Sequence, residues 1–460
     1  MNKKQVRIGQ EPIYDASTLG TPRMLVLGVQ HMFAMFGATV LVPALTGLSV
    51  SSTLLFAGLG TLLFHLLAKG KVPAFLGSSF AFIGGYAAIA PMLENPAKPG
   101  VFNVPNTELL PYACFGVACA GLMYVILSAL FKLCGIKKVM RFFPPIVTGP
   151  VIICIGLTLS GSAITNCATH WWIALVAIAV VICCNIWGRG MVKIIPILLG
   201  VAASYLIAAL TGNVDFSAVR DAAWVGLPFH WDSTLFGLFT RENLDTGLLV
   251  TSAVTIVPLA IATMVEHIGD MCAISSTCQR NYLEEPGLHR TLLGDGLATS
   301  LASLFGAPAN TTYGENTGVL ALSRVYDPKV IRIAACLAVL FSFSPKFAAL
   351  VSAMPQATMG GVSLVLYGMI SAVGVRNVVE NQVDFTNSRN VIIAALILVL
   401  AIGINYGPGS VSFAAGSATI SLSGLAVASI TGIVLNAVLP GKDYEFGTDP
   451  KGDTAVNFKV

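Results

Sequence analysis

Long apolar runs separated by short polar stretches dominate the pattern of this 460-residue chain. A helix needs about 20 consecutive apolar residues to cross the hydrocarbon core of a bilayer. The pattern therefore predicts an all-α polytopic membrane protein. Its fourteen predicted transmembrane segments lie at about 24–46, 50–68, 72–92, 110–134, 142–161, 171–187, 194–212, 246–274, 292–308, 311–323, 330–352, 356–374, 391–406 and 416–439.

Three of these segments are poor continuous helices. Glycines and Pro73 interrupt the third, Asp295 falls inside the ninth, and the tenth is short and contains Glu315. The third and tenth segments occupy equivalent positions in two halves of seven segments each, and residues 144–156 resemble residues 355–368. Because seven is odd, similar halves would insert with opposite topology. Broken segments at equivalent positions of inverted repeats are typical of a transporter binding site.

The basic residues indicate the orientation. With the N-terminus in the cytoplasm, all but four of the 26 Lys and Arg residues fall on the cytoplasmic side, the exceptions being Lys98, Arg220, Arg241 and Lys346. This asymmetry favours fourteen membrane spans with both termini cytoplasmic. The polar residues before the first segment do not have the form of a cleavable signal peptide.

Composition narrows the class further. The chain is 55% hydrophobic and 10% charged, with a mean hydropathy of +0.80, which excludes a soluble globular domain and a disordered chain. The net charge of +4 does not indicate a nucleic-acid partner. The ten cysteines form no CxxC pair, and the chain has no HExxH, GxSxG or P-loop motif. We therefore expect a transporter driven by an ion gradient, without a cofactor or metal and without enzymatic activity.

Six ionisable side chains fall at mid-membrane depth, where charge is costly: His31, Glu266, His267, Asp270, Asp295 and Glu315. Glu266 and Asp270 are four residues apart and so share a helix face. Two acids on one buried face cannot readily both be ionised, so one of them is a candidate proton carrier; the alternative is a permanently neutral acid bonded to a neighbouring helix. His267 points about 100° away from Glu266 and is given less weight.

The two broken segments predict a site where they cross. Glu266 and Glu315 would be acceptors, the backbone N–H groups of Phe80 and Gly314 would be donors, and Phe80 and Tyr313 would supply aromatic faces, unless these rings only pack. Such a site suits a small, flat, neutral heterocycle. It suits an anion poorly, because no Lys or Arg is expected at that depth.

Five motifs resemble the nucleobase–ascorbate transporter family: QHMFAMFGATVLVP (30–43), PAFLGSSFAFI (73–83), EHIGD (266–270), EPGLHR (285–290) and NTTYGENTGV (310–319). The resemblance implies fourteen segments in two inverted repeats, with short extended pieces in the third and tenth. It implies a core domain (24–134 and 246–352) and a gate domain (142–212 and 356–439). The cytoplasmic ends (1–23 and 440–460) and an outer loop (213–245) complete the chain. Homodimers through the gate domain are also expected.

The same resemblance implies roles for individual residues. Phe80, Glu266, Tyr313, Gly314 and Glu315 match substrate-contacting positions. Glu266, Asp270 and His31 are expected to take part in proton coupling, and His31 also holds the site by hydrogen bonding in relatives. Supporting positions are Ser79, Asp295 and Asn316, and Asp295 is expected near the cytoplasmic end of its segment.

The substrate expected from this resemblance is uracil, taken up with protons across a bacterial inner membrane. Glu315 resembles the uracil carriers, whereas Asp270 resembles the purine-transporting branch. Glu315 decides for uracil as the nearer contact, because a carboxylate can accept the N–H groups of that base. Xanthine or another purine stays open as the alternative. An anion transporter of the same architecture and a membrane-embedded enzyme are less favoured, since the first needs a buried cation and the second a nucleophile–base pair or metal cluster.

Overall fold

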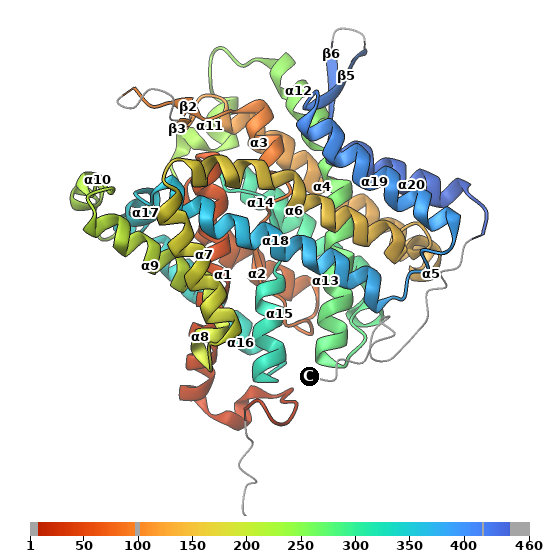
Figure 1. The fold of residues 1–460 in the computed structure, drawn as a ribbon, viewed down its shortest axis with the longest axis horizontal. Helices are drawn as coiled ribbons and strands as arrows, with labels where there is room; N and C mark the ends of the chain where they lie inside the picture. Colours follow the sequence, from red (N-terminus) through yellow and green to blue (C-terminus); the bar gives the residue numbers. More distant parts are fainter. Residues whose placement is uncertain (1–7, 97–101, 416–417, 442–460) are drawn as a thin grey trace, which may run out of the picture.

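The computed structural model describes residues 8–96, 102–415 and 418–441, and it is mostly helical (Figure 1). The helices of the first half are α1 (Thr21–Thr46), α2 (Val50–Leu67), α3 (Ile83–Ile89), α4 (Leu110–Cys134), α5 (Ile136–Met140), α6 (Pro145–Ala168), α7 (Trp171–Ile186), α8 (Met191–Ile194), α9 (Pro196–Leu210), α10 (Ser217–Asp221) and α11 (Leu235–Phe239). Those of the second half are α12 (Thr246–Ile256), α13 (Leu259–Cys278), α14 (Leu288–Leu304), α15 (Gly314–Ser323), α16 (Pro328–Ser342), α17 (Pro345–Ser352), α18 (Gln356–Glu380), α19 (Ser388–Tyr406) and α20 (Gly424–Val438).

Short strands and turns complete the described chain. The strands form three antiparallel pairs: β1 (Leu76–Ser78) with β4 (Asn310–Thr312), β2 (Leu93–Glu94) with β3 (Phe102–Val104), and β5 (Ser410–Ala415) with β6 (Ala418–Ser423). The 3₁₀ turns are η1 (Ala16–Leu19) and η2 (Trp231–Ser233), and η3 (Leu283–Gly287) is a π-helical turn.

The chain is a multi-pass membrane protein. Within the described residues, seven helical stretches are long and apolar enough to cross a bilayer, and α16 with α17 would form an eighth, bent by 89°. Three shorter apolar helices, α7, α9 and α20, accompany them. The count of fourteen segments stays a prediction.

Many of these helices begin at residues that cap them. The side chains of Ser49, Asp245, Asp327, Asn387 and Ser423 accept backbone N–H groups at the starts of α2, α12, α16, α19 and α20. Such caps satisfy N–H groups that have no partner inside the helix. Polar residues between apolar runs thus define where each helix starts.

The helices pack in two groups. In the first, α14 packs on α2 and α4, α16 packs on α1 and α2, and α15 packs on α1 and α13. In the second, α18 packs on α6 and α7, α19 packs on α6 and α20, and α7 packs on α9 (Figure 1). Small residues allow the close contact of α6 with α18. A Cβ atom at Gly156 would lie 2.1 Å from the carbonyl oxygen of Tyr367, so only glycine fits at this crossing.

The third and tenth predicted segments each contain a strand followed by a short helix, β1 with α3 and β4 with α15. β1 pairs with β4 in the register Leu76↔Thr312, Gly77↔Thr311 and Ser78↔Asn310. Neighbouring helices satisfy the outer edges of this pair. The Leu76 N–H donates to Thr61 Oγ1 of α2 (2.9 Å), and Thr299 Oγ1 of α14 donates to the Asn310 carbonyl (2.9 Å). A buried backbone in a membrane requires such partners.

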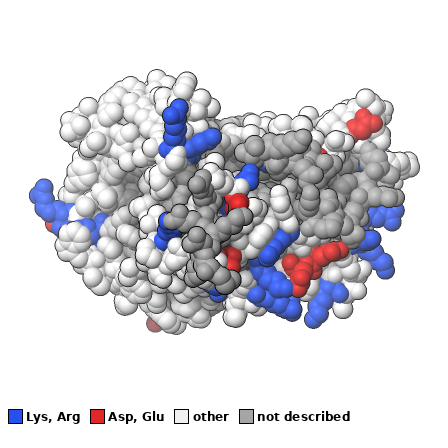
Figure 2. Space-filling model, turned by 90° about the horizontal axis from the view of Figure 1, so that it is seen from below, with Lys and Arg blue, Asp and Glu red and all other residues white. Residues whose placement is uncertain are grey.

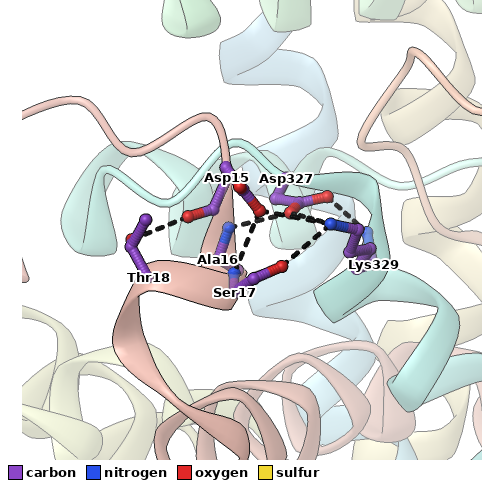
Figure 3. Close-up of polar contacts among 6 residues, drawn as sticks. All are labelled: Asp15, Ala16, Ser17, Thr18, Asp327 and Lys329. Atoms are coloured by element: carbon purple, nitrogen blue, oxygen red, sulfur yellow. Dashed lines mark hydrogen bonds and ion pairs between the residues drawn. The ribbon is translucent and has the colours of Figure 1, made fainter.

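The described part of the N-terminal segment is tied to the turn before α16 (Figure 3). The Ala16 N–H donates to Asp327 Oδ2 (2.8 Å), and Lys329 Nζ donates to Asp15 Oδ1 (3.2 Å). Ile13, which is buried, forms an isolated parallel bridge with Val325. Residues 8–19 therefore pack against the helix bundle; residues 1–7 and 442–460 of the two predicted cytoplasmic ends lie outside the described residues.

The predicted segment boundaries are wrong at two places in the second half of the chain. Helix α20 begins at Gly424, and the first part of the segment predicted at 416–439 belongs to β6, which pairs with β5; residues 416–417 lie outside the described part. The segment predicted at 330–352 is the bent pair α16–α17. Apolar composition does not distinguish a strand from a helix over so few residues, and Ser344 and Pro345 start a new helix in the second case.

Candidate functional site

A cavity of about 390 Å³ lies between the two groups of helices. α1, α13 and the β4–α15 segment line it from the first group, and α6, α9 and α18 line it from the second. Its volume is in the range typical of small-molecule sites. Three carboxyl groups, those of Glu266, Asp270 and Glu315, line it together.

The cavity brings together six of the predicted site residues. Phe80, Glu266, Asp270, Tyr313, Gly314 and Glu315 all line it. His31, Ser79, Asp295 and Asn316 do not line it, and all four are buried. The residues predicted to contact the substrate therefore line the cavity, whereas the predicted supporting residues are buried outside its lining.

Helix α13 presents Glu266 and Asp270 one turn apart on the cavity side. The Thr312 hydroxyl donates to Asp270 Oδ2 (2.8 Å), so β4 holds one of the two acids. Glu266 Oε2 is buried and has no hydrogen-bond partner among the described residues. An unpartnered buried oxygen is costly, and a ligand N–H in the cavity would satisfy it.

Tyr313, at the junction of β4 and α15, is fixed from several sides. Its hydroxyl donates to the Ser78 carbonyl (2.9 Å) and lies 3.4 Å from Thr39 Oγ1 on α1. A Cβ atom at Gly77 would lie 2.4 Å from the ring of Tyr313. Gly77 is therefore required for the ring to pack this close to β1.

Gly314 and Glu315 begin α15 directly after this strand. Gly314 is exposed, and no atom lies within 4 Å of the position that a Cβ would take. The first N–H groups of a helix lack partners within the helix. The start of α15 therefore offers accessible backbone donors beside the Glu315 carboxyl.

Two buried pairs of polar side chains stand behind the cavity. Asn316 Nδ2 lies 3.1 Å from His31 Nδ1 and donates to the His31 carbonyl (3.2 Å), which joins α15 to α1. His267 Nδ1 lies 2.9 Å from Asp295 Oδ2, and both side chains are fully buried, which joins α13 to α14. The neighbour of Asp295 is therefore His267 of the preceding helix, α13.

Helices of the second group supply a mainly apolar wall. Ile152, Ile197, Leu366 and Met369 line this side. The Phe80 ring meets the Tyr367 ring of α18 edge to face, with centroids 5.7 Å apart. An apolar wall opposite carboxyl groups leaves the acids and the backbone of the first group as the main sources of hydrogen bonds for a ligand.

Lys193 of α8 also lines the cavity. Its side chain is exposed, and so are Leu322 and Val373 of the same lining, so these residues mark the open end. The wall around the buried acids contains no Lys or Arg among the described lining residues.

Residues 22–410, more than half of the chain, match the family model described as the Permease family (Xan_ur_permease). The chain belongs to this family. A relative named "Uracil permease" from Bacillus caldolyticus is 41% identical over 439 residues, which are 94% of this chain and 94% of the relative. Another of the same name, from Bacillus subtilis (strain 168), is 38% identical over 454 residues, 96% of this chain and 97% of the relative. This permease is accordingly a transporter and not an enzyme.

The permease fold also has a solved counterpart. The transmembrane domain of a cyanobacterium bicarbonate transporter, BicA, matches with a TM-score of 0.56 at 16% identity, covering 86% of this chain and 97% of that chain. At this identity the likeness concerns the fold alone. It supports the membrane-transporter architecture of the permease.

Sequence reasoning missed three residues of the permease cavity or its supports. Thr312 holds Asp270, Tyr367 packs on Phe80, and Lys193 lines the open end. Thr312 directly precedes Tyr313 in a broken segment, and that position was the available signal for it. Tyr367 and Lys193 come from helices distant in sequence, and only their packing shows the association.

Proposed function

We propose that this permease carries uracil across the membrane together with protons. The observation that carries the proposal is the gathering of Glu266, Asp270 and Glu315 around one cavity of small-molecule size. The relatives named uracil permease, which match over nearly the whole chain, support the choice of base. Uracil is small, flat and neutral, with two N–H donors and two carbonyl acceptors, and the donors suit carboxylate acceptors.

Binding would use both the acids and the backbone. Glu266 and Glu315 accept the ring N–H groups, and the N–H groups of Phe80 and Gly314 donate to the carbonyl oxygens. Phe80 and Tyr313 cover the faces of the ring. The unpartnered Oε2 atom of Glu266 and the open surroundings of Gly314 support these roles.

Coupling would use an acid that carries the proton with the base. Glu266 or Asp270 is protonated when uracil binds, because two neighbouring carboxylates in a buried site repel each other. His31, Ser79, Asp295 and Asn316 hold the elements around the site. The bonds from Asn316 to His31 and the contact of Asp295 with His267 support that assignment.

Transport would follow movement of a core domain against a gate domain. The proposed core comprises 24–134 and 246–352, and the proposed gate comprises 142–212 and 356–439. The proposal includes fourteen segments in two inverted repeats, and the strand-then-helix form of β1–α3 and β4–α15 supports it. The two helix groups that meet at the cavity support a movement between them.

The proposed location is a bacterial inner membrane, with both termini cytoplasmic. Figure 2 shows the lower side of the molecule in Figure 1, where the N-terminal segment and α8 lie, and Lys and Arg side chains are exposed over it. Basic residues gather on the cytoplasmic side of membrane proteins. A homodimer formed through the gate domain is part of the same proposal.

A xanthine or other purine permease is the second candidate. Asp270 favours it, because an aspartate at this position resembles the purine-transporting branch of the family. Thr312 already donates to one oxygen of Asp270, which weakens the case for a direct contact between Asp270 and the base. We therefore favour uracil.

The test is uptake of labelled uracil into cells or proteoliposomes, with unlabelled uracil and xanthine as competitors and with or without a protonophore. Glu315→Gln, which replaces an acceptor oxygen by a donor, should raise the half-saturating uracil concentration by about 10- to 100-fold, as for loss of a hydrogen bond to a charged group. Glu242→Gln, at an exposed glutamate outside the cavity, is the matched control. Unchanged affinity in Glu315→Gln would refute the site, and xanthine competing better than uracil would establish the second candidate.

A further inference from the structure

A second cavity, of about 450 Å³, shares no lining residue with the first and lies beside the bend between α16 and α17. Its walls are mainly apolar and come from α10 (Val219), the end of α16 (Leu340 and Phe341) and α17 (Phe347 and Leu350). The 89° bend turns α17 away from the line of α16, and the space is left beside the turn.

A basic side chain stands at the edge of this apolar space. Lys346 lines the cavity, and its ammonium lies 4.9 Å from the ring centroid of Trp224, which also lines it. The same ammonium donates to the backbone carbonyl of Arg220 (3.3 Å), and the Lys346 N–H donates to the carbonyl of Ala223 (2.9 Å). The cation is therefore held in place, and the amine keeps further N–H donors for a ligand.

The charge around Lys346 is mixed but favours an anion. Arg220, whose carbonyl accepts from the Lys346 ammonium, is exposed, and the exposed Asp221 follows it directly. Two basic residues thus accompany one acid at this edge. Both Arg220 and Lys346 belong to the few basic residues that the predicted topology places on the outer side.

The surroundings of the cavity are apolar and exposed. Leu340 of α16 is 68% exposed, and Trp224, Val225 and Leu227 of the neighbouring loop are 75%, 79% and 74% exposed. Such a surface is unfavourable in water but favourable against lipid chains. Trp and Lys are typical of the boundary between the chains and the headgroups of a bilayer.

We infer that this cavity binds an anionic phospholipid, with an acyl chain in the apolar space and the phosphate beside Lys346. The apolar walls suit a chain, the fixed ammonium suits a phosphate, and the exposed loop continues the surface toward lipid. The inference does not depend on uracil as the transported base, since its test measures lipid binding and not transport.

The experiment uses the purified full chain in detergent micelles, titrated with phosphatidylglycerol that carries brominated acyl chains. Bromine quenches tryptophan fluorescence on contact. The chain has five tryptophans, and the fluorescence that is lost in Trp224→Phe is the signal of Trp224. We expect quenching of that part at a lower lipid fraction for phosphatidylglycerol than for phosphatidylcholine with the same chains.

Lys346→Gln should raise the phosphatidylglycerol fraction for half-quenching by about fivefold, the factor for one basic side chain beside anionic lipid. Lys137→Gln, at a basic residue of α5 remote from the cavity, should leave it unchanged. Val219→Phe, which narrows the apolar space and keeps the cation, should weaken the quenching, and it serves as the test if Lys346→Gln does not fold. Equal half-quenching by the two lipids, or by wild type and Lys346→Gln, would overturn the inference in favour of unselective lipid contact.

Discussion

Replacing Gly77 by alanine tests whether the strand pair positions the aromatic wall of the site. A Cβ atom at this position would lie 2.4 Å from two ring atoms of Tyr313 and 2.8 Å from Thr39 Oγ1. An unstrained contact needs at least about 3.4 Å, so the ring must move by about 1 Å. The ring is held by the Ser78 carbonyl of β1 and lies beside Thr39 of α1, so a small adjustment of a flexible chain end cannot relieve the contact.

The displacement has a calculable cost. Moving the ring by about 1 Å breaks the bond of 2.9 Å from the Tyr313 hydroxyl to the Ser78 carbonyl and leaves buried polar groups unpaired. Such a loss costs about 1–3 kcal/mol, and overpacking a tight core costs a similar amount. If the ring covers bound uracil, a loss of about 1–3 kcal/mol in binding would raise the dissociation constant by about 5- to 150-fold.

The assay is binding of labelled uracil to the purified protein, together with its melting temperature. Gly84→Ala is the matched control, because Gly84 is the second residue of the following helix and a Cβ there would meet no atom within 4 Å. Gly77→Ala combined with Tyr313→Leu should regain stability, because the smaller side chain makes room, but should not regain full affinity. Wild-type affinity in Gly77→Ala would refute the proposed role of the Tyr313 ring.

Three further substitutions test other parts of the structure. Thr312→Val removes the hydroxyl that holds Asp270, so uptake should fall and its pH profile should change, whereas Thr312→Ser should behave as wild type; identical profiles in both variants would exclude a positioning role for the hydroxyl. Gly156→Ala places a Cβ 2.1 Å from the Tyr367 carbonyl and should lower stability by about 1–3 kcal/mol in thermal unfolding, whereas Gly403→Ala, with open space around its Cβ, should not. Asp327→Ala removes a helix cap and the acceptor of the Ala16 N–H, so hydrogen exchange at residues 8–19 should rise; equal protection would show that other contacts hold this segment.

The sequence was sufficient to predict the membrane class, and it drew attention to the acids and to the two interrupted segments. These features depend on composition and local pattern: apolar runs identify membrane helices, and Glu266, Asp270 and Glu315 stand out because charge is rare at that depth. The spacing of Glu266 and Asp270 also predicts that they share a face, and both line the cavity.

Features that depend on packing could not be predicted in this way. The contact of His267 with Asp295 joins two helices, and neither residue's neighbours in sequence identify its partner. Charge bias assigns Lys193 to a cytoplasmic loop, and only the packing of a short helix shows that this residue lines the open end of the cavity. The β5–β6 pair lies in a stretch whose apolar composition is equally compatible with a helix.

The pairing of β1 with β4 has a consequence for biosynthesis. The bond from Tyr313 to Ser78 joins positions 235 residues apart, and each strand contributes only three residues to the pair. A two-stranded ribbon this short has no stability of its own. A nascent chain that has emerged only as far as α12 therefore contains β1 without its partner strand β4. The peptide groups of β1 then need other hydrogen-bond partners. The chain therefore becomes able to bind a solute late in synthesis, in one step, when β4 enters the helix bundle.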